Sequence, residues 1–358
     1  MKTNKSKTGQ KWLVTGGSGF LGINLIRKLV AQGHQVISLD IEPFTYTDVK
    51  ESIEHHVVDI RNKRLVNHFM SQNVDVFVHS AAALPLYKKE DIYSTNVEGA
   101  TNVFDAAYAN GVYRGIHISS TAVYGIPKKH PIYEDDPLVG VGPYGETKIT
   151  AEKRVREYRQ KGMCITTIRP KSFIGPERLG VFAIFYQWAA EGRSFPMIGR
   201  GRNLYQLLHV YDVCDAILLA AAHEDSNAVN TEFNIGAKEF STMRDDYQVV
   251  LDRAGFGKKI KESPAHLVIF ALEVLAFFKL SPLYPWVYKT ATKDSFVSIE
   301  KAEAILNFHP KFSNKDALLD NYQWYLDNRY QFTGREYDKT THRVPWNQGI
   351  LGLARHLF

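Results

Sequence analysis

The glycine-rich segment at residues 15–22, TGGSGFLG, constrains the fold of this 358-residue chain more than any other feature. A short apolar run precedes it, and helical spacing follows over 22–31, so the order is strand, turn and helix. Gly16 and Gly19 permit unusual backbone angles and the approach of an anion, and Gly22 permits close packing of the helix. The helix N-terminus then offers free N–H groups to a pyrophosphate. The segment predicts a dinucleotide site, with an ordinary glycine-rich turn as the plainer alternative.

An acidic residue, Asp40, ends the second expected strand, 35–39. Its carboxylate can accept hydrogen bonds from both hydroxyls of an adenosine ribose and would repel a 2′-phosphate. No Arg or Lys follows at 41–43 to receive such a phosphate, so NAD is predicted rather than NADP. Asp59 and Ile60 follow the third strand and could flank the adenine, or Asp59 could simply cap the strand end.

Strands and helices continue to alternate along the first half of the chain. The further expected strands are 11–15, 55–58, 74–79, 115–119 and 164–168, and the helices are 95–110 and 144–161. This alternation predicts an α/β fold with a Rossmann-like, doubly wound parallel sheet.

After residue 175 the pattern loosens into pieces separated by Gly and Pro, which predicts a smaller, mixed C-terminal lobe that binds substrate. Helices are expected there at 213–223, 241–254 and 314–327. The predicted organisation is a flexible leader at 1–10, an NAD-binding domain at 11–175 completed by a strand and helix from about 205–235, a mainly substrate-binding lobe at 176–335, and a C-terminal extension at 336–358.

One strongly apolar segment, 267–280, carries Glu273 in its middle. At 14 residues it is shorter than the roughly 20 that cross a hydrocarbon core, so it predicts a buried helix and no transmembrane segment. Contact with a membrane surface or with an apolar substrate is the alternative.

The formal net charge is +6, and lysines of the leader contribute to it. A solvated tail is the expected role, with a nucleic-acid or acidic-membrane contact as the alternative, and no nucleic-acid partner is predicted. The leader lacks a secretory signal pattern, so a cytoplasmic location is expected. Cys164 and Cys214 have no paired spacing, which predicts two buried thiols and neither a disulfide nor a metal site.

A candidate catalytic pair, Tyr144 and Lys148, lies four residues apart in YGETK and therefore on one helix face. A phenol with a pKa of about 10 is a poor base at neutral pH, but an adjacent ammonium stabilises the phenolate and lowers that pKa. Ser119 and Ser120 end a strand, where a hydroxyl can point into the crevice beyond the sheet. Together these groups predict proton chemistry around one substrate oxygen.

Several motifs together resemble the extended short-chain dehydrogenase/reductase superfamily, in particular its NAD-dependent epimerase/dehydratase group. They are TGGSGFLG, the Asp40 position, VVDIRN, HSAA, STNVEGATNV, SSTAVYG, YGETK and IRPKSFIGP. The likeness runs over residues 11–176 and more loosely to about 330; C-terminal features are also similar to 3β-hydroxysteroid dehydrogenase-like members. The resemblance implies that Ser120 orients the substrate oxygen, Tyr144 is the acid/base, and Lys148 binds the ribose and tunes the phenol.

The same resemblance implies a set of cofactor-binding residues. They are Gly16, Gly19, Phe20, Leu21, Gly22, Asp40, Asp59, Ile60, Ala81, Ala82, Asn96, Ser119, Tyr144, Lys148, Pro170, Ser172 and Phe173. In the plainer interpretation Asn96 only begins a helix and Ser119 is an ordinary strand residue. Family members often pair two helices of each subunit, which implies a homodimer through 95–110 and 144–161.

The substrate is less sharply predicted. Oxidation of a secondary alcohol of a nucleotide sugar, followed by return of hydride to the other face, makes an epimerase the first hypothesis. Related epimerases place an arginine on the diphosphate where this chain has Tyr205, although Arg200 and Arg202 are close and could substitute. Dehydration is disfavoured because Thr121 and Ala122 replace the usual acidic pair. The alternatives are a dehydrogenase of a hydrophobic alcohol and a non-catalytic NAD-binding regulator.

Overall fold

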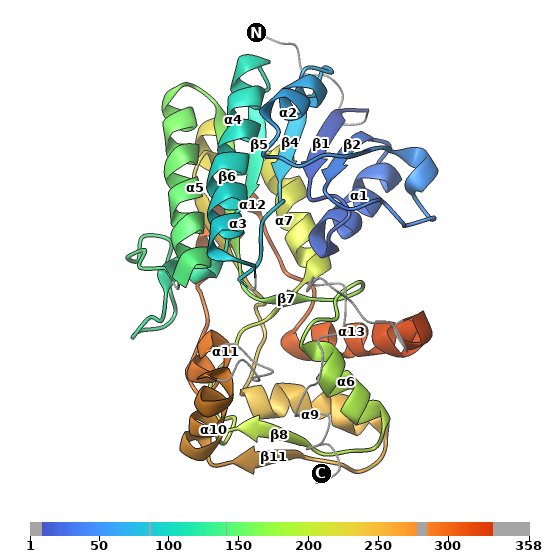
Figure 1. Ribbon diagram of the computed structural model, residues 1–358, viewed down its shortest axis with the longest axis vertical. Helices are drawn as coiled ribbons and strands as arrows, with labels where there is room; N and C mark the ends of the chain where they lie inside the picture. The colour runs from blue at the N-terminus through green and yellow to red at the C-terminus, as the bar shows by residue number, and fades with distance from the viewer. Residues whose placement is uncertain (1–8, 86, 141, 278–284, 332–358) are drawn as a thin grey trace.

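The computed structural model describes residues 9–85, 87–140, 142–277 and 285–331 (Figure 1). Residues 1–8 of the predicted leader and the whole predicted extension 336–358 lie outside the described residues. The described chain forms a larger lobe around a sheet and a smaller lobe at the opposite end of the molecule (Figure 1). The functional assignment of the two lobes stays a prediction.

A seven-stranded parallel sheet forms the centre of the larger lobe, in the order β10-β6-β5-β4-β1-β2-β3. Its strands are β1 (Lys11–Thr15), β2 (Gln35–Asp40), β3 (Glu54–Val57), β4 (Val76–His79), β5 (Arg114–Ile118), β6 (Cys164–Pro170) and β10 (Glu232–Ile235). The chain builds outward from β1 to β3 and then returns to place β4 on the other side of β1. Open α/β sheets bind ligands at such a switch point, beyond the carboxyl ends of the strands. The predicted doubly wound α/β fold is confirmed.

Alternate residues of β1 show how the sequence divides the core into two layers. Trp12 and Val14 pack in the cluster that includes α1 (Phe20–Ala31) and α7 (Val210–Ala222). Leu13 packs in a second cluster on the other face, because successive strand side chains point to opposite faces. The helices of this second layer are α2 (Lys63–Met70), α4 (Ala100–Ala109) and α5 (Gly142–Gln160).

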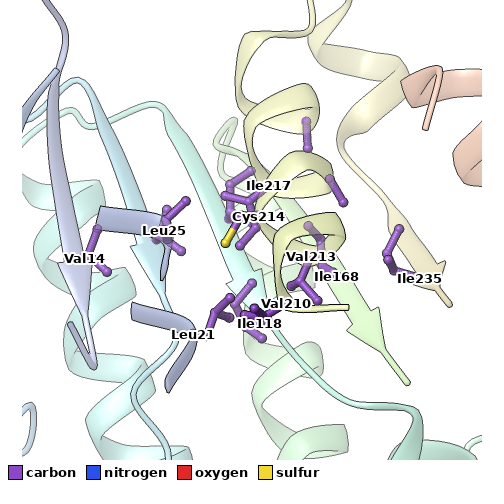
Figure 2. Packing of buried hydrophobic residues seen from close by; sticks show 14 of the residues in the cluster. Val14, Leu21, Leu25, Ile118, Ile168, Val210, Val213, Cys214, Ile217 and Ile235 are labelled. Atoms are coloured by element: carbon purple, nitrogen blue, oxygen red, sulfur yellow. The ribbon is translucent and has the colours of Figure 1, made fainter. Parts of the chain in front are cut away.

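Figure 2 shows the first of these layers, where Leu25 of α1 and Ile217 of α7 approach each other above the sheet. Cys214 of α7 lies within this apolar layer. Both cysteines are buried and free, so the prediction of two buried thiols is confirmed.

The smaller lobe has its own apolar cluster, formed by α6 (Phe182–Ala190), α9 (Met243–Ala254) and α13 (Asn314–Asn328). Two short parallel strands, β8 (Phe195–Ile198) and β11 (Ile260–Ser263), lie beside them. A two-stranded link, β7 (Phe173–Ile174) with β9 (Leu208–His209), joins the lobes. The remaining elements are α3 (Lys89–Tyr93), α8 (Ser226–Val229), α10 (Ala265–Phe277), α11 (Pro285–Thr290), α12 (Glu300–Leu306), a π-helix (Ser94–Gly99) and 3₁₀ turns at Lys50–Ser52, Thr121–Tyr124 and Arg329–Gln331.

The prediction of a buried helix at 267–280 is wrong for the described part of that segment. Of the apolar side chains of α10, Leu272 is 7% exposed, but Phe270 is 66% and Phe277 84% exposed. The helix contacts α11 and β8 on one side, and in the described part of the chain no element covers the phenylalanine side. Apart from Glu273, the described part of the segment is apolar on all sides, so its sequence does not reveal which apolar face is left uncovered. Among the described residues, no helix is long and apolar enough to span a bilayer.

Candidate active site

The glycine loop between β1 and α1 is closely interlocked with the segment after β4. Gly16 has φ of 77°, and a Cβ atom there would lie 2.8 Å from the backbone nitrogen of Ala81. A Cβ at Gly22 would lie 2.2 Å from the carbonyl oxygen of Gly16. Sequence reasoning passed over Gly17, where a Cβ would lie 2.0 Å from Ser38 Oγ. The loop therefore has the backbone cradle that a pyrophosphate requires.

Asp40 stands at the rim of this loop, at the end of β2. Its carboxylate accepts hydrogen bonds from the backbone N–H of Ser18 at 2.9 Å and of Glu42 at 3.0 Å. Burial raises the pKa of Asp40, and these backbone hydrogen bonds act in the opposite direction. A carboxylate has about four acceptor positions, so positions are left for ribose hydroxyls.

The other acid proposed for the adenine side, Asp59, is paired with Arg61. The Nη2 atom of Arg61 lies 2.6 Å from Oδ2 of Asp59, and this hydrogen bond lowers the pKa of Asp59. Ile60 is buried and packs against Gly99, where a Cβ would lie 2.7 Å from the Ile60 side chain. The roles of Asp59 and Ile60 beside an adenine stay predictions.

Three predicted catalytic residues come together at the carboxyl end of β5 and the start of α5. Ser120 caps the turn Thr121–Tyr124, its Oγ accepting from the backbone N–H of Ala122 at 3.1 Å. Tyr144 lies in the first turn of α5, and burial raises its pKa to about 12, whereas a hydrogen bond with Ser120 and the charge of Arg178 act to lower it. The serine and the phenol are thus in contact, but the expectation that the adjacent ammonium lowers the pKa of Tyr144 is wrong here, because burial outweighs the charges around the phenol.

Lys148, one turn along α5, lies beneath the phenol. Its Nζ is 5.8 Å from the centre of the Tyr144 ring and donates a 2.9 Å hydrogen bond to the carbonyl oxygen of Ile118. Burial lowers the pKa of Lys148 to about 8, against the opposing charge of Glu152. Because the side chain is anchored to β5, the ammonium is held at a fixed position near the phenol.

A buried ionic network below the site was not predicted. The hydroxyl of Ser119 donates to Glu152 Oε1 at 2.6 Å, and the guanidinium of Arg169 binds both oxygens of Glu152, at 2.9 and 2.6 Å. Arg169 Nη1 also donates to the hydroxyl of Tyr124 at 2.7 Å. Lys148 and Glu152 are four residues apart and so lie on one face of α5, and this spacing could have indicated that Glu152 belongs to the network. The cofactor-binding role of Ser119 stays a prediction.

Asn96 ties the loop after β4 to the catalytic helix. Its Oδ1 accepts from the backbone N–H of Ala83 at 2.7 Å, and its Nδ2 donates to Thr147 Oγ1 at 3.2 Å. The residue lies in the π-helical turn Ser94–Gly99, which widens the helix before α4. Asn96 therefore positions the segment that carries Ala81 and Ala82. The contact of these two alanines with a cofactor stays a prediction.

Two predicted cofactor-binding residues that are far apart in the sequence, Phe20 and Phe173, lie side by side next to the glycine loop. The rings of Phe20 and Phe173 stack with centres 5.3 Å apart and planes at 16°. Arg178, which sequence reasoning missed, places its Cζ 5.6 Å from the centre of the Phe20 ring. Pro170 ends β6 beside Ile235 of β10. The sequence feature that could have indicated a role for Arg178 is its position two residues after the Gly-Pro pair that ends IRPKSFIGP.

On the expected substrate side, Tyr205 and Ser172 meet, with 3.2 Å between their hydroxyl oxygens. Arg200 and Arg202 lie exposed after β8, and the described residues show no ion pair for either. Their contact with a substrate stays a prediction. Among the described residues, no His, Cys, Asp and Glu side chains group in a way that could hold a metal ion.

Comparisons with known proteins identify a family. The NAD dependent epimerase/dehydratase family matches residues 12–236. An uncharacterised protein of Sinorhizobium fredii is 32% identical over 343 residues, 95% of this chain and 84% of that protein. The UDP-glucose 4-epimerase of Lactobacillus helveticus is 30% identical over 255 residues, 63% of this chain and 76% of that protein. The crystal structure of UDP-glucose 4-epimerase from Thermotoga maritima has a TM-score of 0.75 at 23% identity, covering 89% of this chain and 100% of that one.

The chain belongs to the NAD-dependent epimerase/dehydratase family. The resemblance inferred from the motifs is thereby confirmed, as is the prediction of an NAD-dependent enzyme of this family.

Proposed function

We propose that this protein is an NAD-dependent epimerase that oxidises a secondary alcohol of a nucleotide sugar and reduces the resulting ketone on its other face. The observation that carries the proposal is the contact between Tyr144 and Ser120, with Lys148 fixed beneath the phenol. This group lies beyond the carboxyl end of β5, next to the switch point where the glycine loop lies. A dinucleotide held by that loop would run toward the catalytic group.

The residues present fit NAD. Any side chain at position 16 or 22 would fill the backbone cradle, so the glycines leave room for a pyrophosphate. Asp40 offers hydrogen-bond acceptors to a ribose diol and disfavours a 2′-phosphate. Bound NAD supplies a reversible hydride acceptor.

The protein's own groups would handle the proton. Ser120 holds the substrate hydroxyl in place by hydrogen bonding and stabilises negative charge on its oxygen. Tyr144, as phenolate, accepts the hydroxyl proton and later returns it. Burial has the largest effect on the Tyr144 pKa and raises it, while Ser120 and the guanidinium of Arg178 act to lower it. The ammonium of Lys148, 5.8 Å from the ring centre, would also favour the phenolate.

A nucleotide sugar is supported as substrate by the relatives, among them the UDP-glucose 4-epimerase of Lactobacillus helveticus. A dehydrogenase of a hydrophobic alcohol is the second candidate, favoured by the uncovered apolar side of α10. A non-catalytic regulator would not need the Tyr144–Lys148 pair. The predicted homodimer, paired through α4 and α5, and the cytoplasmic location stay predictions.

A ligand panel separates the two enzyme hypotheses. Protein loaded with NAD is incubated with UDP-, GDP- and dTDP-sugars and, separately, with sterols and other apolar alcohols. The proposal predicts thermal stabilisation by one nucleotide series and interconversion of two sugar epimers, seen by NMR, without net NADH. Net NADH formed only with an apolar alcohol would establish the second candidate instead.

A further inference from the structure

Lys171 is a buried cation at the junction of the two lobes. It follows the last residue of β6, and its backbone N–H donates to the carbonyl oxygen of Ile235 at 2.8 Å. The side chain is 4% exposed, and its Nζ donates to Ser295 Oγ at 2.6 Å. In the described part of the chain no carboxylate pairs with this ammonium, and burial lowers its pKa to about 7.

A second lysine shows what is missing around Lys171. Lys301 Nζ donates to Thr231 Oγ1 at 2.8 Å and lies 5.2 Å from the centre of the Phe233 ring. Lys171 has the same arrangement, a hydroxyl acceptor and a ring, with its Nζ 5.2 Å from the centre of Tyr205. Burial lowers the pKa of Lys301 too, and the charges of Arg169 and Arg159 act in the same direction, but the charges of Glu134 and Glu232 oppose the effect. For Lys171 burial acts without an opposing charge. A buried ammonium without such support opposes folding, so packing alone gives no reason for the charge of Lys171.

The surroundings of Lys171 border the candidate active site. Tyr205, below the ammonium, shares a hydroxyl contact with Ser172, and the charge of Arg178 acts on both Tyr205 and Tyr144. Ser295 pairs with Tyr205 through a β-bridge, which holds the acceptor of Lys171 against the same segment. The ammonium therefore lies where the carboxyl edge of the sheet meets the substrate-side segments.

We infer that Lys171 receives an oxyanion of the substrate, either a phosphate or a carboxylate group, and so helps to determine substrate specificity. An ammonium has three N–H donors, and Ser295 takes one of them. Hydrogen bonds from a cation to an oxyanion are short and strong, and in a desolvated site the bound anion replaces the absent counter-charge. This inference rests on the proposed function, because it assumes that an anionic substrate enters the crevice.

The test compares wild type with Lys171→Met and Lys171→Gln by calorimetric titration in the presence of NAD. The probes are UDP, dTDP and GDP with their nucleosides, and UDP-glucuronate against UDP-glucose. Lys301→Met is the matched control, since it removes a lysine that likewise donates to a hydroxyl but lies beside Glu134 and Glu232. Thermal unfolding of each variant checks folding; neutral side chains at 171 remove a buried charge and are expected to unfold no earlier than wild type.

The inference predicts that both position-171 variants bind the best nucleotide about tenfold to a hundredfold more weakly, with NAD affinity and the control unchanged. If the variants lose affinity for nucleoside diphosphates but not for nucleosides, the group that Lys171 binds is a phosphate. If they lose affinity only for UDP-glucuronate, the group is a carboxylate. Unchanged affinity for every anion, or no anion binding by wild type, overturns the inference. Because binding is read without turnover, nucleotide binding that depends on Lys171 but without epimer formation would count against the proposed function alone.

Discussion

The hydroxyl of Ser119 donates a 2.6 Å hydrogen bond to the buried carboxylate of Glu152. Its neighbour Ser120 instead contacts the phenol of Tyr144. Two adjacent serines therefore have separate partners, one in the ionic network below the site and one in the site itself. The network fixes α5 against β6, because Glu152 lies on the helix and its partner Arg169 on the strand.

Glu152→Gln is expected to destabilise the protein strongly, by about 3–5 kcal/mol, because it leaves the buried guanidinium of Arg169 without its counter-charge. Urea unfolding measures the loss. Glu303→Gln, which removes the half-buried partner of the exposed Lys238, serves as control and is expected to cost about 1 kcal/mol or less. Equal small losses in both variants would show that the buried pair does not hold α5 in place.

Asp40 is expected to make the protein prefer NAD to NADP. The carboxylate lies at the rim of the glycine loop and would repel a 2′-phosphate. Titration of wild type with each cofactor is predicted to give at least about tenfold tighter binding of NAD, roughly 1.4 kcal/mol. Asp40→Asn should narrow that ratio and Glu42→Gln should leave it unchanged, whereas tighter binding of NADP by wild type would contradict the role of Asp40.

His117 is expected to make stability fall as the solution becomes acidic. Its ring stacks on His79 with centres 5.5 Å apart, and neither ring nitrogen of His117 has a hydrogen-bond partner among the described residues. Burial, with the nearby charge of Lys148, holds the pKa of His117 well below its ordinary value, and burial lowers that of His79 to about 3. The native state therefore keeps both rings neutral.

The sign follows from proton uptake by the unfolded chain. Above pH of about 6.5 both states are neutral at these rings, but below it the unfolded state binds protons that the native state refuses. Each ring then removes about 1.4 kcal/mol of stability per pH unit. Between pH 6 and 5 the free energy of unfolding of His117→Leu should therefore fall by about 1.4 kcal/mol less than that of wild type. His309→Gln, which changes an exposed histidine, is the control and should behave like wild type. Parallel curves for wild type and His117→Leu would exclude this contribution.

Local sequence patterns were enough to predict the parts of the fold around the glycine loop, where the cofactor is predicted to bind. The strand at 11–15 matches β1, and the glycine loop, the helix after it and Asp40 lie as expected. These features are local, because strand alternation, glycine conformation and helical spacing act over a few residues. The Tyr144–Lys148 pair was predictable for the same reason.

Features that depend on long-range packing could not be predicted in this way. The bond from Ser119 to Glu152 spans 33 residues, and that from Lys171 to Ser295 spans 124. The uncovered face of α10 depends on which elements pack against it, and apart from His266 and Glu273 the helix is apolar on every side. The partner of a buried charged group therefore cannot be predicted from the local sequence and is known only from the folded structure.

Turnover by Tyr144→Phe tests the central claim, that this phenol moves the substrate proton, most directly. The variant keeps the ring above Lys148 and removes the hydroxyl that contacts Ser120. With the nucleotide sugar that wild type converts, kcat is predicted to fall about 10²- to 10⁴-fold while NAD affinity stays within about twofold. Tyr93→Phe, which loses an exposed hydrogen bond to Glu146, should turn over normally. A Tyr144→Phe enzyme with kcat within a few-fold of wild type would contradict the account.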